Sequence, residues 1–151
     1  MSTPPRQLFL DCDGVLADFD AGAFALLGMA PKDFQDRHGV GRFWARLARH
    51  PDFYGTLPLM PQAMELFDAV RHLHPIILTG LPMGQWAARH FPGTKIVTTL
   101  ARDKRNHAQP GDVLVDDQIK HRHLWEEMGG VFIHHQTVER TLQELRPYFP
   151  L

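Results

Sequence analysis

The chain has 151 residues, 44% of them hydrophobic and 22% charged, which is the composition of an ordinary globular protein with one domain. Its formal net charge of −1 excludes a generally basic surface for nucleic-acid polymers. No apolar run approaches the roughly 20 residues needed to span a bilayer, so we expect no membrane association.

The first predicted strand, at residues 7–11, begins a series of short apolar segments. Its sequence, QLFLD, is almost continuously apolar rather than alternating, as is typical of a strand buried on both faces of a parallel sheet. Further segments of this kind lie at residues 75–79, 112–116 and 130–134, and a weaker one lies at residues 94–98.

Segments with helical spacing alternate with these strands from residue 61 onward. One helix is predicted to begin at Pro61, because proline suits the first helical position. Two more are predicted between His121 and Met128 and between Val138 and Phe149, where apolar residues recur at helical intervals. The alternation predicts an α/β fold, a Rossmann-like three-layer sandwich with a central parallel sheet.

Residues 17–60 interrupt this alternation. They contain the helix-like stretches AGAFALLG and GRFWARLARH but no good strand. We interpret them as a small helical cap inserted after the first strand and folded over one edge of the sheet. The α/β core would then comprise residues 1–16 and 61–151.

The compartment follows from the cysteine content and the N-terminus. Cys12 is the only cysteine, so no intramolecular disulfide can form, which suits a reducing cytoplasm. The N-terminal sequence MSTPPRQ lacks the apolar region of a signal peptide. We therefore expect a soluble, cytoplasmic protein.

Polar residues follow three of the predicted strands where each strand ends. Asp11 and Asp13 follow the first, Thr79 ends the second, and Asp116 and Asp117 end a later one. Because the carboxyl ends of parallel strands share one edge, we expect these side chains to meet in a crevice. Clustered carboxylates repel unless a cation or protons neutralise them, and all-oxygen ligands favour Mg²⁺.

Phosphate is the obvious anion for such a metal site. Thr79 and Gly80 offer a hydroxyl and an accessible N–H to phosphoryl oxygens. Lys104, in LARDKRNHAQPGD just before the strand that ends at Asp116, offers a compact ammonium group. It could balance a nucleophilic carboxylate and a phosphoryl group together.

Each feature alone has a simpler explanation. A D-x-D pair is more often a turn or a cap, and a strand ending in Thr-Gly is a weak signal. Asp116 and Asp117 could cap the next helix, where acids are favoured. Lys104, between Arg102 and Arg105, could be a solvated surface charge. Their order, each at a predicted strand end or loop, favours a shared site.

The sequence resembles the haloacid dehalogenase (HAD) superfamily of phosphatases. DCDGVL fits the signature D-x-D-x-[TV]-[LV], and IILTG, Lys104 and VLVDD fit the other three motifs in order. It is more closely similar to the 5'(3')-deoxyribonucleotidase family in DGVLADF, LARDK, GDVLVDD and the helical cap. It departs from that family in KRNHAQPGD and in the shortness of the cap.

The resemblance implies a role for each matching residue. Asp11 would attack phosphorus to form an aspartyl-phosphate, and Asp13 would act as the general acid and base. Thr79 would hold a phosphoryl oxygen, and Lys104 would neutralise charge and orient Asp11. The implied metal ligands are Asp11, Asp13 through its main-chain carbonyl, Asp116 and Asp117.

Two neighbours of the D-x-D pair have structural roles. Gly14 would let the backbone turn sharply, since glycine tolerates positive φ. Cys12 should point to the opposite side of the chain and pack in the core rather than react.

Specificity is expected to lie in the cap. The candidates for stacking on a base are Phe19, Phe24, Phe43 and Trp44, and those for contacting a further anion are Arg42 and Arg46. The alternative is that these aromatic side chains pack the cap's own core.

The leading hypothesis is a Mg²⁺-dependent phosphomonoesterase, a 5'-nucleotidase-like hydrolase acting on a (deoxy)nucleoside monophosphate. The alternatives are a phosphatase for a sugar phosphate or other metabolite and a non-enzymatic receiver-like phospho-switch. The expected partner is a small phosphorylated metabolite or nucleotide, with no nucleic-acid polymer and no membrane, and the oligomeric state stays open.

Overall fold

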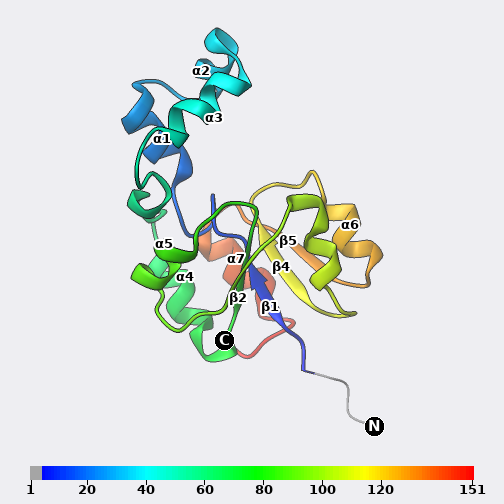
Figure 1. Ribbon diagram of the computed structural model, residues 1–151. Coiled ribbons are helices and arrows are strands. Elements are labelled where there is room, and N and C mark those ends of the chain that lie inside the picture. Colours follow the sequence, from blue (N-terminus) through cyan, green and yellow to red (C-terminus); the bar gives the residue numbers. More distant parts are fainter. Residues whose placement is uncertain (1–4) are drawn as a thin grey trace.

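A five-stranded parallel sheet lies at the centre of the computed structural model, which describes residues 5–151 (Figure 1). The strands are β1 (Leu8–Leu10), β2 (Ile76–Thr79), β3 (Ile96–Thr98), β4 (Val113–Asp116) and β5 (Val131–His134). Their order in the sheet is β3-β2-β1-β4-β5, so β1 is central and lies between β2 and β4. All five predicted strands are confirmed, each to within two residues. The first four residues of MSTPPRQ, the segment expected to lack a signal peptide, lie outside the described part.

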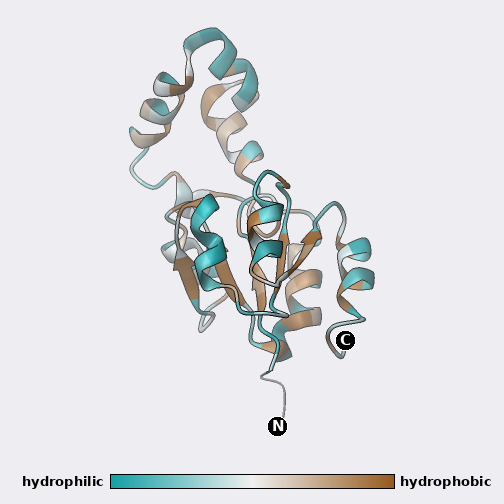
Figure 2. Cartoon of the chain, turned by 90° about the vertical axis from the view of Figure 1, so that its right-hand side faces the viewer, coloured by the Kyte–Doolittle hydropathy of each residue, from teal (hydrophilic) through white to brown (hydrophobic). Residues whose placement is uncertain are grey.

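Helices cover both faces of the sheet, which confirms the predicted α/β sandwich. Along β1, Leu8 and Leu10 pack in the larger core, and Phe9 packs in a smaller core on the other face. The larger core is covered by α4 (Ala63–Val70), α5 (Gly84–His90) and α7 (Val138–Leu145). The opposite face is covered by α6 (Arg122–Glu127) and a 3₁₀ helix, η3 (Ala101–His107). In Figure 2 the strands are hydrophobic along their length, as burial on both faces requires.

Two predicted helix boundaries are wrong by a few residues. The helix expected at Pro61 begins at Ala63, because Gln62 adopts a left-handed backbone conformation with a φ of 62°. The last helix ends at Leu145 rather than Phe149, although the Phe149 side chain is still buried in the larger core. Cys12 is fully buried in that same core, which confirms its packing role.

Helices α1 (Phe19–Leu27), α2 (Pro31–His38) and α3 (Val40–Ala48) stand apart from the sheet (Figure 1), followed by a short 3₁₀ helix, η1 (Tyr54–Thr56). We call residues 17–60 the cap; these boundaries stay a prediction. The two segments that join it to the core are paired, since the Asp18 N–H donates to Pro58 O at 2.7 Å and the Met60 N–H to Leu16 O at 2.8 Å. The chain therefore enters and leaves the cap at one place.

No helix in residues 5–151 combines the length and the apolar character needed to cross a membrane.

Candidate active site

The loop after β1 turns back sharply towards the end of β4. The Asp11 N–H extends the sheet by donating to Val115 O at 2.9 Å, and the Leu16 N–H then closes a turn onto Cys12 O at 2.7 Å. Gly14 lies in this turn with a φ of 79°. A Cβ there would collide with the Asp117 carboxylate, so both the backbone conformation and the close approach require glycine.

Lys104 is a buried residue rather than a solvated surface charge. Its side chain comes from η3 and the residue is only 6% exposed. Its Nζ donates to Asp11 Oδ1 at 2.9 Å and to Asp116 Oδ2 at 3.1 Å. The ammonium group therefore bridges the carboxylates at the ends of two adjacent strands, as the sequence hypothesis requires.

Asp116 and Asp117 do not cap the next helix, because α6 begins only at Arg122 and its N-cap is His121. Asp116 Oδ1 instead accepts the Gln118 N–H at 3.0 Å. Asp11, Asp116 and Asp117 each offer one carboxylate oxygen, and the three oxygens lie within 4.8 Å of one another.

A divalent cation fits this set of oxygens. Among the described residues, Asp117 Oδ1 and Asp13 Oδ1 are buried side-chain atoms without a hydrogen-bond partner. Such atoms are costly unless something satisfies them. A hard cation with oxygen ligands would do so, and the donors would be carboxylates of the kind Mg²⁺ accepts.

Asp11, Asp13 and Asp117 have raised pKa values, so these three acids hold their protons more tightly than usual. Burial raises the pKa of Asp11 well above its ordinary value, against the opposing effect of Lys104. Burial, followed by the charges of Asp117 and Asp20, raises the pKa of Asp13 to about 6. Burial also raises the pKa of Asp117. For Lys104, burial acts to lower the pKa, but the Asp11 and Asp116 carboxylates outweigh it and the pKa is raised. The single ammonium group thus leaves the cluster short of positive charge.

Asp13→Asn is expected to stabilise the metal-free protein, because asparagine keeps the shape and removes a buried charge. Since the folded-state pKa exceeds the ordinary 3.8, wild-type stability falls as pH rises from 3.8 to about 6. At pH 8 the variant's free energy of unfolding should exceed that of wild type by about 1–2 kcal/mol. This is less than the full pKa shift of Asp13 implies, because the side chain is partly exposed.

Urea unfolding in EDTA at pH 4 and pH 8 measures this difference. The control is Asp36→Asn, which removes an exposed acid from α2. The prediction would be contradicted if Asp13→Asn were no more stable than wild type at pH 8. It would also be contradicted if the stability difference between the two proteins were the same at pH 4 and pH 8.

A cavity of about 240 Å³ brings together the predicted site residues that lie outside the cap. It is lined by Asp11, Asp13, Thr79, Gly80, Lys104, Asp116 and Asp117, among others. Thr79 is 1% exposed and its Oγ1 accepts the Leu81 N–H at 3.2 Å. The hydroxyl proton of Thr79 is therefore left to donate to a ligand in the cavity.

The aromatic residues of the cap that were predicted to bind substrate do not line this cavity. Phe43 is 1% exposed and its ring packs against Trp44 and Phe19, at centroid distances of 4.9 and 6.2 Å. Trp44 is 43% exposed. Phe19 alone approaches the site, in a neighbouring hollow of about 220 Å³ that Asp13 also lines. For Phe43 the structure thus favours the alternative, packing of the cap's own core.

The sequence reasoning missed two residues near the carboxylates. Gln118 lines the cavity and holds Asp116 through its main-chain N–H. His134, at the end of β5, donates from Nε2 to the main-chain oxygen of Asp117 at 3.1 Å. In the sequence, the only signal for Gln118 was its place after VLVDD, and the only signal for His134 was its place at the end of the strand segment GVFIH. The structure pairs His134 with Asp116 across β4 and β5.

Comparison with known proteins rests on structure alone. No protein-family model matches the chain, and neither does any curated protein. An L-2-haloacid dehalogenase from Xanthobacter autotrophicus, with chloropropionic acid covalently bound, matches with a TM-score of 0.56 and 14% identity, over 97% of this chain and 85% of that one. The chain has the haloacid dehalogenase fold.

Two proteins of Streptococcus pneumoniae share this haloacid dehalogenase fold. A hydrolase from strain TIGR4 has a TM-score of 0.59 and 10% identity, over 95% of this chain and all of that one. A haloacid dehalogenase-like family protein has a TM-score of 0.58 and 13% identity, over 93% of this chain and 98% of that one. Likeness at these identities concerns the fold alone.

Proposed function

We propose that the protein is a HAD-type hydrolase, a Mg²⁺-dependent phosphomonoesterase that works through an aspartyl-phosphate on Asp11. The observation that carries the proposal is the buried Lys104 ammonium, which bridges Asp11 and Asp116 beside Thr79 in one cavity. Phosphoryl transfer needs mainly positioning and charge stabilisation, and these groups supply both.

Asp11 is the nucleophile in this mechanism. Lys104 holds Asp11 Oδ1 at 2.9 Å, which orients the carboxylate and leaves Oδ2 to attack phosphorus. The Thr79 hydroxyl donates to a phosphoryl oxygen, and the N–H of Gly80 is placed at the same cavity wall. Phosphorus then becomes bonded to Asp11 while the leaving oxygen departs.

Asp13 moves the protons. Its pKa of about 6 leaves part of the population protonated near neutral pH, so it can protonate the leaving oxygen. As a carboxylate it can then take a proton from the water that hydrolyses the aspartyl-phosphate. Asp13 lies two residues after Asp11, directly before Gly14, and both carboxyl groups line the same cavity.

The metal would be held by the carboxylates of Asp11, Asp116 and Asp117 and by the main-chain carbonyl of Asp13. When bound, Mg²⁺ supplies the positive charge that offsets the phosphate and the carboxylates. Lys104 is the cation that contacts the cavity's carboxyl groups directly. Arg102 and Arg105 also line the cavity, but they pair with Asp103 and Glu127, so a phosphate dianion beside four carboxyl groups still needs the metal's charge.

A (deoxy)nucleoside monophosphate is the leading substrate, with a sugar phosphate or other metabolite as the alternative within this class. A 2-haloacid is a second candidate, because a dehalogenase shares the fold. The carboxylate cluster favours a phosphate ester, because the cation it would hold suits a phosphate dianion, which needs charge neutralisation more than the monoanion of a haloacid does. A receiver-like phospho-switch would instead show an aspartyl-phosphate that lasts for many minutes in the purified protein.

A substrate panel tests the proposal directly. It should contain 5'- and 3'-monophosphates in ribo and deoxy forms, sugar phosphates and 2-chloropropionate, with phosphate and chloride release measured. We expect phosphate release with Mg²⁺, none in EDTA, and recovery on adding Mg²⁺ back. Equal rates on nucleotides and sugar phosphates would remove the nucleotide preference. Chloride release without phosphate release, or full activity in EDTA, would contradict the phosphatase.

A further inference from the structure

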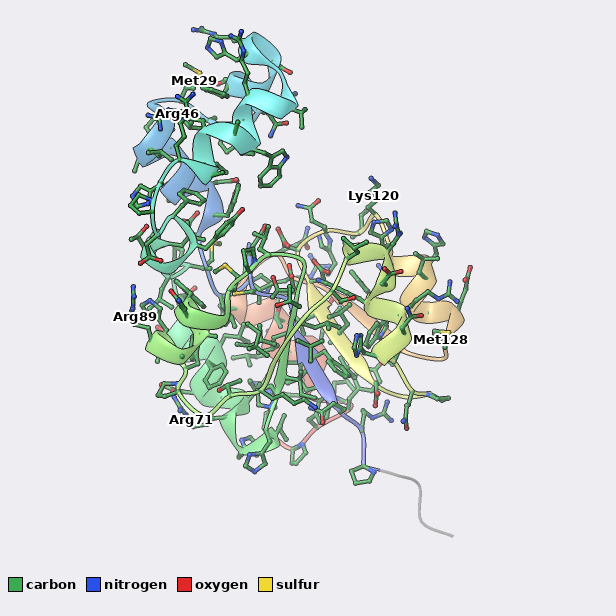
Figure 3. The ribbon with its side chains drawn as sticks, in the orientation of Figure 1. Met29, Arg46, Arg71, Arg89, Lys120 and Met128 are labelled. Atoms are coloured by element: carbon green, nitrogen blue, oxygen red, sulfur yellow. The ribbon has the colours of Figure 1, made fainter. Side chains whose placement is uncertain are left out.

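A groove between α2 and α3 lies on the cap, outside the candidate active site. It has a volume of about 470 Å³ and is lined by Phe34, His38, Arg42, Ala45, Arg46 and Arg49. None of these residues lines the cavity that holds Asp11. Figure 3 shows Arg46 on the cap, at a distance from the sheet.

Three arginines form one stripe along this groove. Arg42, Arg46 and Arg49 are spaced by four and three residues, which places them on one face of α3 and its C-terminal end. With a rise of 1.5 Å per residue, their backbones span about 10 Å. Phe43 and Leu47 of the same helix point into the core, so the arginines occupy a separate face.

The charges of this stripe are not neutralised within the described part of the chain. None of the three guanidinium groups forms an ion pair there, whereas Arg71 and Arg122 each pair with an acid on the same helical segment. The groove lining itself contains no acidic side chain. Three like charges held so close together repel each other, and an anion in the groove would relieve this repulsion.

We propose that this groove binds a phosphate-rich anion of about three negative charges, the di- or triphosphate group of a nucleotide or an inorganic polyphosphate. The volume falls in the range of small-ligand sites, roughly 300–1,000 Å³. Arginine is the side chain best suited to phosphate, because its planar fork donates two parallel hydrogen bonds. Phe34, whose ring lies 4.7 Å from that of His38, adds an aromatic wall on which a base can stack.

This site is independent of the proposed hydrolysis. It shares no lining residue with the catalytic cavity, and none of the clustered carboxylates Asp11, Asp116 and Asp117 lines it. The ligand is therefore not a substrate of Asp11 but a second ligand of the cap. The phosphatase assay and the binding assay can fail separately.

Calorimetric titration of the full chain in EDTA tests the proposal, with inorganic triphosphate, ATP and adenosine as probes. We expect triphosphate and ATP to bind and adenosine not to bind, with weaker binding at higher salt because the arginines are solvent-accessible. Tighter binding of ATP than of triphosphate identifies a nucleotide as the ligand, and equal binding identifies the polyphosphate group alone. Absence of binding by both anions overturns the proposal.

Variants locate the site. Arg42→Gln combined with Arg46→Gln should weaken triphosphate binding by roughly 10- to 100-fold, since each charged hydrogen bond contributes substantially. Arg49→Gln alone should weaken triphosphate binding by less than the double variant does. Because Arg49 is exposed, this single variant should fold and still tests the site if the double variant does not fold. The matched control is Arg71→Gln combined with Arg122→Gln, on the core (Figure 3 labels Arg71), and it should bind as wild type does.

Two results overturn this assignment. Binding that survives in the Arg42 and Arg46 variant but is strengthened in Asp11→Asn, which removes a negative charge from the catalytic cavity, places the anion in that cavity instead. Binding of a single-stranded oligonucleotide more tightly than ATP assigns the stripe to a nucleic-acid backbone and not to a small ligand.

Discussion

Replacing Asp11 by asparagine is expected to lower kcat for phosphate-ester hydrolysis by roughly four orders of magnitude or more, as removal of a nucleophile does. An amide oxygen can still accept the hydrogen bond from Lys104, which is 2.9 Å long, but the amide cannot attack phosphorus. The fold should be retained, because the Asp11 main-chain bond to Val115 does not involve the side chain.

The measurement is kcat on the best substrate of the panel, together with the far-UV circular dichroism and the thermal midpoint. Asp103→Asn, on η3, removes a carboxylate outside the cavity lining and serves as the matched control. Turnover within tenfold of wild type in folded Asp11→Asn protein would refute the aspartyl-phosphate mechanism.

Replacing Lys104 by methionine is expected to destroy both activity and a large part of the stability. The residue is 6% exposed and is the shared partner of Asp11 and Asp116, so its removal leaves two buried carboxylates without their cation. Breaking a buried ion pair in this way costs about 3–5 kcal/mol. A loss of kcat of at least roughly 10²-fold should accompany it, as for the loss of one electrostatic donor.

The stability loss in Lys104→Met should depend on pH in a defined direction. The pKa of Asp11 is already raised by burial, and loss of Lys104 removes the main effect that lowers it. The folded variant therefore takes up a proton more readily than the unfolded chain, so its deficit should shrink as pH falls. Urea unfolding between pH 5 and pH 8 measures this, with Lys95→Met, at an exposed position, as the control. A deficit that grows towards acid pH, or no deficit, would contradict the buried bridge.

Four of the five strands and their ends were predictable because their residues are largely buried on both faces of the sheet; β3, at the edge, is only partly buried. QLFLD, PIILT, DVLVD and GVFIH are apolar almost throughout, and parallel strands bring their carboxyl ends to one edge. Asp11, Thr79 and Asp116 therefore had to lie near one another once β1 was flanked by β2 and β4.

The cap was less predictable, because the apolar face of a helix does not say what it packs against. Phe43 suited a base-stacking role as well as a core role, and only the packing of α1 and α3 shows that its ring is enclosed. Helix α2, with the sequence PKDFQDRH, has little apolar periodicity and was not predicted. The partners of Lys104 likewise depend on how η3 lies over the sheet, which local sequence does not determine.

The paired entry and exit of the cap make the protein modular. Ala17 lies beside Leu59, and hydrogen bonds on both sides of this contact already close the loop at the core. The length of chain between them then adds little further closure entropy to folding of the sheet. A longer, shorter or different segment can replace these helices without moving Asp11, Thr79 or Asp116. The sheet edge that carries the carboxylates and the helices of the cap are thus separable parts of one chain, and the cap can change while the sheet edge is retained.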